Sequence, residues 1–423
     1  MFSKFLLLFT IPDLRKKILF ILGMLVLFRI GAAIPIPGVD VMQLKLFLEG
    51  NQFFGLLNIF SGGALASLSI MMLGVAPYIT ASIIMQLMTI IFPRMKELYQ
   101  EEGEIGRRKF NQYSRYLGVP LGLIQSYGLL VILSNQNIIP HLTTVGFATN
   151  MIVATAGSVI LMWIGELITE KNVGNGVSFL IFAGIVSAIP TQVLQVAATF
   201  DASQIPSYLA FLAISIVVIA GVVFITEGQR NIPVSYARRI RGSRVLGGVQ
   251  THLPLRVNQA GVIPIIFAIS VILFPGMIGN FLINVSNSTV HAIAQFLVAL
   301  FNNTTFYTVV YFFLVFIFTF FYTLITFDPQ GIADNIQKQG GFVLGIRPGR
   351  PTAEHLYHIV NRVTLVGGLF LGIIAVLPLI VTQALQLSAF TIGGTALLIA
   401  VSVILETKRQ VEAHVVMREY ENV

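Results

Sequence analysis

Residues 61–87 read SGGALASLSIMMLGVAPYITASIIMQL, an apolar run that Gly62-Gly63, Gly74 and Pro77 interrupt. Glycine and proline both weaken a helix interior, so this run is poorly suited to one continuous helix. No charged residue occurs between residues 50 and 93. As one helix, that uncharged stretch would extend about 66 Å, roughly twice the ~30 Å hydrocarbon core of a bilayer. We therefore expect two parts, and the surrounding charges indicate whether both cross the membrane.

The composition of the whole chain indicates a polytopic membrane protein. Its 423 residues are 56% hydrophobic and only 10% charged, and the mean hydropathy is +0.85. Such a chain is expected to form one integral domain. The net charge of +8 is typical of basic cytoplasmic loops and does not require nucleic-acid binding. The chain has no cysteine, which excludes disulfides and thiolate chemistry.

Apolar segments predict ten membrane spans, and basic residues orient them. The predicted spans are residues 18–35, 74–92, 116–133, 150–168, 177–196, 208–225, 257–281, 306–327, 363–385 and 392–405. This assignment places 24 of the 26 Lys and Arg residues on one side, counting two at span edges. The exceptions are Arg29, inside span 1, and Lys45, on the opposite side. The positive-inside rule then predicts a multi-pass cell-membrane protein with both termini cytoplasmic.

The same charges divide the opening stretch. The basic groups at residues 15–17 and 94–109 are both expected in the cytoplasm, so two spans lie between them and not three. Residues 61–73 should therefore re-enter the membrane or plug the protein without crossing. Broken backbone at membrane depth is tolerated where protein or a water-filled cavity surrounds it.

Parity predicts the domain organisation. Ten spans divide into an N-terminal half, residues 1–200, and a C-terminal half, residues 201–423. Because five is odd, structural repeats would have to be inverted about an axis in the membrane plane. The fold class expected from the spans and their charges is therefore an all-α polytopic membrane protein with two inverted five-helix halves and a re-entrant plug segment.

Two long cytoplasmic loops, residues 227–256 and 328–362, have features of a binding surface. In the first, β-prone segments 232–239 and 245–255 flank the sequence RGSR at residues 241–244, which predicts a hairpin. In the second, residues 342–344 lead into a turn at 345–349 that presents Arg347, and a helix should follow through residue 362. Loops of this length with defined turns favour a partner site over lipid binding or orientation alone.

The predicted spans contain no acid or histidine at mid-membrane depth. This absence argues against ion-coupled transport, a metal site and acid–base catalysis in the bilayer. Ser82 and Ser178 have no His or Lys partner in the spans, which argues against a serine protease. We therefore predict no enzyme, no catalytic or metal-binding residue and no cofactor. For Arg29, snorkelling or pairing with a carbonyl or span-edge acid is favoured over a functional charge.

An ion-coupled secondary transporter is the alternative, because that class shares ten spans, inverted repeats and a broken helix. An intramembrane enzyme is a weaker third reading. The lack of mid-span acids discriminates against the transporter.

Several segments resemble the SecY family, the channel-forming subunits of the bacterial Sec protein translocon. They are FRIGAAIPIPGVD (28–40), FSGGALASLS (60–69), GVAPYITASIIMQL (74–87), EKNVGNGVSFLIFAGIV (170–186), VNQAGVIPIIFA (257–268), FDPQGIADNIQKQGGFVLGIRPGRPT (327–352) and IGGTALLI (392–399). The resemblance covers essentially the whole chain. It implies an hourglass channel between the halves that translocates unfolded preproteins and releases transmembrane segments laterally into lipid.

The resemblance also implies roles for individual residues. The pore ring would consist of Ile79, Ile83, Ile181, Ile185, Ile266 and Ile399. Ile265 could replace Ile266, which we favour. The plug would be Ser61, Gly62, Gly63, Ala64, Leu65, Ala66, Ser67 and Leu68. A lateral gate, where spans 2 and 7 meet spans 3 and 8, would include Gln86, Asn258 and Phe274.

The implied partners are proteins, RNA and lipid. Arg238, Arg239, Arg244 and Arg347 would contact the motor ATPase SecA or the ribosome, whose RNA phosphates suit arginine. The small subunits SecE and SecG would assemble with the channel. Signal peptides and nascent chains would pass through it, and membrane lipids would surround it.

Overall fold

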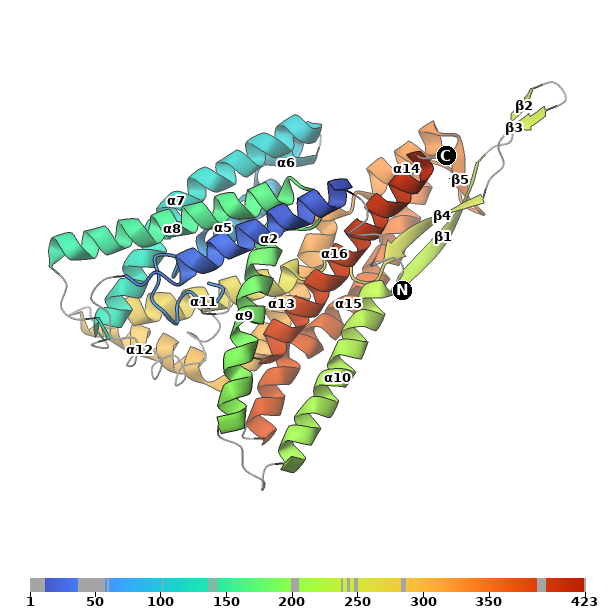
Figure 1. Cartoon of the computed structure of the whole chain (residues 1–423). Helices are drawn as coiled ribbons and strands as arrows, with labels where there is room; N and C mark the ends of the chain where they lie inside the picture. Colours follow the sequence, from blue (N-terminus) through green and yellow to red (C-terminus); the bar gives the residue numbers. More distant parts are fainter. Residues whose placement is uncertain are drawn as a thin grey trace.

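The computed structural model of the chain is mostly helical (Figure 1). It describes residues 12–36, 58, 61–100, 102–135, 138–139, 143–198, 205–236, 239–241, 244–246, 250–282, 287–385 and 393–421. The helices of the first half are α2 (Pro12–Ala32), α5 (Ala76–Ile91), α6 (Pro93–Gln100), α7 (Gly103–Asn135), α8 (Thr144–Thr169) and α9 (Gly176–Ala198). Those of the second half are α10 (Ile205–Glu227), α11 (Ile263–Leu282), α12 (Ser288–Asn302), α13 (Thr304–Thr326), α14 (Pro329–Lys338), α15 (Arg350–Leu385) and α16 (Gly393–Glu421).

Each of the ten predicted spans overlaps one helix, and these helices are α2, α5, α7, α8, α9, α10, α11, α13, α15 and α16. Within the described residues, five helical segments are long and apolar enough to cross a membrane on their own. A sixth candidate is the pair α5 and α6, which bends by 116° at Phe92. The chain is thus a multi-pass membrane protein, and the full number of crossings stays a prediction.

Two stretches expected to lie outside the spans are helical instead. The predicted basic loop at residues 94–115 forms α6 and the beginning of α7, and the charged tail after Glu406 continues α16 to Glu421. In addition, α15 joins the predicted short helix and span 9 into one helix. Hydropathy locates only the apolar part of a helix, whereas Glu, Lys and Arg are themselves good helix formers.

Segment 61–75 is made of turns and enters the interior of the helical bundle. Gly62, Gly63 and Gly74 have φ angles of +66°, +83° and +59°, which glycine adopts without a Cβ penalty. The helix α5 begins directly afterwards, with Pro77 in its first turn. The opening stretch is therefore divided into a segment of turns and a helix that begins at Ala76. That residues 61–73 do not cross the membrane stays a prediction.

The two long loops join in one sheet, which the sequence did not predict. The first loop contributes β1 (Gln229–Tyr236) and β4 (Gln250–Arg256), and the second contributes β5 (Gly341–Val343). The strand order is β4-β1-β5, and Val234 pairs with Val343. A separate hairpin, β2 (Arg239–Arg241) with β3 (Arg244–Leu246), projects beyond the sheet (Figure 1).

The predicted hairpin is therefore correct around residues 241–244, but its second strand is not continuous. Residues 245–255 contribute to β3 and to β4, and each strand belongs to a different ladder.

The two halves meet along two seams. On one side α11 contacts α5 and α7, and on the other side α9 contacts α16. One large hydrophobic core extends across both halves and includes residues of segment 61–75. A second, smaller core lies under the sheet, between it and helices α14 and α15.

Candidate functional site: a cavity between the halves

A cavity of about 880 Å³ opens between α5, α7, α8, α9, α11 and α13. Its lining is divided by chemistry. Charged and amide side chains come mainly from α7, α8 and the α8–α9 connection: Arg108, Asn111, Gln112, Arg115, Glu166, Glu170 and Asn175. Apolar side chains come mainly from α5, α9 and α11: Ile79, Val177, Ile263, Ile266 and Phe267. The cavity therefore has a wettable wall and an apolar wall, and it lies where the two halves face each other.

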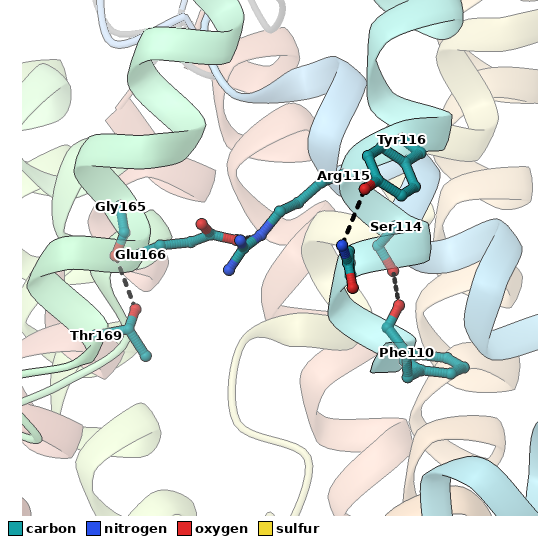
Figure 2. Close-up of polar contacts among 8 residues, drawn as sticks. Phe110, Ser114, Arg115, Tyr116, Gly165, Glu166 and Thr169 are labelled. Atoms are coloured by element: carbon teal, nitrogen blue, oxygen red, sulfur yellow. Dashed lines mark hydrogen bonds and ion pairs between the residues drawn. The ribbon is translucent and has the colours of Figure 1, made fainter. Parts of the chain in front are cut away.

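An ion pair crosses the polar wall. The Arg115 Nε lies 2.5 Å from the Glu166 Oε1, joining α7 to α8 (Figure 2). The Glu166 side chain is 17% exposed and that of Arg115 is 46% exposed, so the pair is partly shielded from solvent. Thr169 Oγ1 donates to the Gly165 carbonyl at 2.8 Å beside it. The sequence located Glu166 at a span edge but gave no signal for its partner 51 residues away.

All six isoleucines predicted for the pore ring are buried, and all belong to the large core. Ile79 of α5 and Ile266 of α11 also line the cavity. Ile83, Ile181, Ile185 and Ile399 are not among the lining residues. Ile265 is buried outside the lining, so the cavity favours Ile266 over its neighbour.

The predicted plug residues lie against α2 and α9. Ser61, Ala64, Leu65 and Leu68 are buried. Gly184 lies between Ile181 and Ile185 on α9, and a Cβ on Gly184 would come within 2.1 Å of the Gly62 Cα. Residues 61–68 therefore contact the helix that carries two predicted ring residues, with backbone directly against backbone.

Two groups of hydrogen bonds brace residues 61–70. Asn58 and Ser61 bond within the segment: Ser61 Oγ accepts from the Leu65 N–H at 3.0 Å, and Asn58 Oδ1 accepts from the Ala66 N–H at 2.9 Å. At the other end, the Ile36 N–H donates to the Leu68 carbonyl at 2.8 Å, and the Ile70 N–H donates to the Ile34 carbonyl at 3.0 Å. The segment is thus internally braced, and its C-terminal end is bridged to the end of α2.

Two predicted gate residues lie on the α5–α11 side with incomplete hydrogen bonding. Gln86 Nε2 reaches Ser82 Oγ at 3.5 Å, and Asn258 Nδ2 donates to the Gly261 carbonyl at 3.2 Å. Among the described residues, the buried Gln86 Oε1 and Asn258 Oδ1 accept no hydrogen bond. Leaving such a group unsatisfied costs about 1–3 kcal/mol. Phe274 is on α11, but its side chain lies outside the described part of the chain.

The predicted partner-binding arginines are at the sheet end. Arg239 is on β2, Arg244 is on β3 opposite Arg241, and Arg347 is exposed in the turn after β5. The Arg347 carbonyl accepts from Thr352 Oγ1 at 2.8 Å, which fixes that turn to the beginning of α15. Because β5 pairs with β1, both arginine-bearing loops belong to one structural unit. Arg238 lies outside the described residues.

A third charged cluster, which the sequence did not reveal, joins α16 to the end of α10, next to the base of the sheet. Arg409 lies 3.4 Å from Glu227 and donates to the Thr226 carbonyl at the end of α10. Burial raises the pKa of Glu406, although the nearby Arg409 and Arg256 oppose that shift. Since Arg256 ends β4, the cluster lies at the base of the sheet.

Fold and cavity together define a mostly helical, multi-pass membrane protein with a partly apolar cavity between α5, α7, α8, α9, α11 and α13. The family model of SecY matches residues 69–408. The protein translocase subunit SecY of Streptomyces scabiei is 42% identical over 98% of this chain and 97% of its own length. The chain therefore belongs to the SecY family. Residues 61–68 fall just outside the matched range.

Solved structures share the fold. A SecY structure, described as showing that its plug domain stabilises the closed state and maintains a membrane seal, has a TM-score of 0.63 at 19% identity. It covers 94% of this chain and 91% of its own. Sec61 from a canine ribosome-channel complex of the endoplasmic reticulum has a TM-score of 0.58 at 19% identity, with the same coverage.

Proposed function

We propose that this chain is a protein-conducting channel of the cell membrane. It moves unfolded preproteins across the bilayer and releases transmembrane segments sideways into lipid. The observation that supports this most is the cavity between the halves, with Ile79 and Ile266 in its lining and the buried turns of residues 61–68 against the adjacent α9. A passage with a yielding apolar constriction suits a polypeptide, whose sequence varies and whose charge pattern is not fixed.

The proposed pore works by exclusion. Six isoleucines, Ile79, Ile83, Ile181, Ile185, Ile266 and Ile399, form a ring whose branched side chains dewet the constriction and block ions. The same side chains separate around a passing chain, because apolar contacts are non-directional. Residues 61–68 close the resting channel as a plug. Ten spans in two inverted halves, residues 1–200 and 201–423, surround this passage.

Lateral release uses the seam where α11 meets α5 and α7. Gln86, Asn258 and Phe274 belong to this gate. The unsatisfied amide oxygens of Gln86 and Asn258 support the assignment, because opening the seam to water or to a signal peptide gives both groups new donors. The closed seam thus lacks two hydrogen bonds that the open one supplies.

Energy comes from outside the chain. The sheet end faces the cytoplasm, with both termini on that side. Arg238, Arg239, Arg244 and Arg347 there contact SecA or the ribosome, and SecE and SecG complete the channel. The structurally similar Sec61 occurs in a ribosome-channel complex, which supports the ribosome as one of the partners.

Crosslinking of a stalled preprotein tests the channel. Because the chain has no cysteine, single Ile→Cys variants at the six ring positions carry a unique reactive group. We expect each to crosslink to a partly translocated chain. The matched control is Ile160→Cys, on α8 and 44% exposed on the outer surface, which should remain unlinked. Equal crosslinking at residue 160, or ion-driven uptake of a small solute by the chain without a partner, would contradict the proposal.

A further inference from the structure

Arg29 is the one basic residue inside predicted span 1, and it contacts the plug. Its Nη1 donates to the Gly62 carbonyl at 3.0 Å, across 33 residues of sequence. Its guanidinium carbon also lies 5.9 Å from the centre of the Phe28 ring. A charged donor makes a hydrogen bond roughly twice as strong as a neutral one. Arg29 is exposed on α2, and inside predicted span 1 an unpaired charge would be costly, so the Gly62 carbonyl is a favoured partner.

The plug backbone comes close enough to Arg29 because residue 62 is glycine. A Cβ there would lie 2.5 Å from Phe28 Cζ, and the φ angle of +66° disfavours other residues. On the far side, Gly184 lets α9 contact the same backbone. Gly62 is therefore held between α2, through Arg29 and Phe28, and α9, through Gly184.

The two ends of the plug are attached differently. Residues 68–70 share two backbone hydrogen bonds with residues 34–36, as in a short strand pair. Residues 61–66 are braced mainly by Asn58 and Ser61, which are parts of the same segment. The described hydrogen bond between residues 61–66 and α2 is the one from Arg29 to the Gly62 carbonyl. Next to the bridge, Ser67 Oγ donates to the Ala32 carbonyl at 2.9 Å. The second end is therefore held by paired backbone bonds, whereas the first end is held by packing and by the single Arg29–Gly62 bond.

We propose that Arg29 is the latch of the channel: it holds residues 61–68 closed by donating to the Gly62 carbonyl, and the plug opens as a unit about the bridge between residues 34–36 and 68–70. This inference rests on the proposed role of residues 61–68 as the plug. It makes Arg29 a positioning residue, since its charge neither touches the passing chain nor seals the pore itself. A preprotein opens the channel when it displaces Gly62 from the guanidinium.

Resting ion conductance of the purified channel in planar bilayers tests the latch. We expect Arg29→Met to raise the open fraction about tenfold or more, the factor for losing one hydrogen bond to a charged group. Deleting residues 61–68 should leak at least as much. Combined, the two changes should leak no more than the deletion alone, because they remove the same closure. Arg29→Lys should restore part of the seal, and Arg15→Met, on the exposed beginning of α2, should stay tight.

The outcomes separate the two proposals. If the deletion leaks and Arg29→Met stays tight, the latch is wrong and the plug stands. If the deletion itself stays tight, the plug assignment is wrong. If Arg29→Met adds to the leak of the deletion, Arg29 seals the pore elsewhere and the latch is again wrong.

A second variant disturbs the same contact while keeping the charge, in case Arg29→Met is not recovered in the membrane. Gly184→Ala places a Cβ 2.1 Å from the Gly62 Cα and should also leak, whereas Gly23→Ala, with open space on α2, should not. A thiol at Ala66→Cys should react faster with a water-soluble maleimide in the Gly184→Ala background. An unchanged labelling rate together with unchanged conductance would overturn the latch.

Discussion

Residues 61–75 and the three-stranded sheet are both non-helical, but they are held in place by different interactions: packing for residues 61–75 and backbone hydrogen bonds for the sheet. The sheet consists of regular ladders between β1, β4 and β5 over a small core of its own. Residues 61–75 contribute Leu65, Leu68 and Met72 to the main core, and close backbone approaches to Gly157 and Gly184 position them. Moving the sheet breaks a ladder, whereas moving the predicted plug breaks a few single hydrogen bonds and separates complementary surfaces. This difference fits the roles proposed above, a docking platform for the sheet and a releasable closure for residues 61–68.

Truncating a buried side chain in the core under the sheet should have the largest effect on stability. It should leave the predicted plug closed. Leu356 of α15 is fully buried there. Leu356→Ala should destabilise the sheet by about 2–5 kcal/mol, the usual cost of such a cavity. Hydrogen exchange should then accelerate in residues 229–236 and 341–343 and stay slow in residues 64–72.

The control for that change is Leu344→Ala. Leu344 directly follows β5 and is 53% exposed, so its replacement should leave hydrogen exchange as in the unmodified protein. Equal acceleration in residues 64–72 of the Leu356→Ala protein would mean that the two regions unfold together. The sheet and residues 61–75 would then not be independently held regions, and the contrast drawn between them would be wrong.

Adding a side-chain atom where α8 meets the backbone of residue 70 should have an intermediate effect on stability. A Cβ on Gly157 of α8 would lie 2.0 Å from the Ile70 carbonyl oxygen, which is backbone and cannot rotate away. Gly157→Ala should destabilise the protein by about 1–3 kcal/mol through overpacking. Thermal unfolding in detergent should show a lower midpoint, and resting conductance should rise.

Gly118→Ala is the matched control on the neighbouring α7, because its Cβ would find its closest neighbour at an ordinary 3.8 Å. A Gly157→Ala channel as stable and as tight as this control would show that the plug does not depend on close backbone contact.

Much of this arrangement could be predicted from the sequence, for a physical reason. Residues that cross a membrane must be apolar, basic loops set the orientation of the spans, and glycine and proline interrupt helices. These local patterns are therefore enough to locate α5 and the interrupted segment before it. The turn at residues 345–349 was predicted for the same reason: Gly345 and Gly349 have φ angles of +82° and +90°.

What the sequence did not reveal depends on pairing across long separations. The addition of β5 to β1, the Arg115–Glu166 ion pair and the Arg29–Gly62 contact each join residues that no local pattern relates. Arg29 shows the limit most clearly. A carbonyl partner was among the expected alternatives, yet the identity of that carbonyl, in the plug itself, required the fold.

Reversing one charge on the platform should have the smallest effect on stability and a selective effect on transport. Arg347 is exposed, and its turn is held by its carbonyl and Thr352 rather than by its side chain. Arg347→Glu should therefore leave abundance and the unfolding midpoint unchanged, since surface substitutions usually stay within about 0.5 kcal/mol. Transport into vesicles driven by SecA should fall severalfold, because a partner with an acidic surface now meets a like charge.

The matched control is Lys338→Glu, at the exposed end of the adjacent α14. It adds a negative charge outside the turn and should transport normally. Equal loss in both variants would assign the effect to general surface charge, and a parallel loss of abundance would make Arg347 part of the fold of the platform rather than of its binding surface.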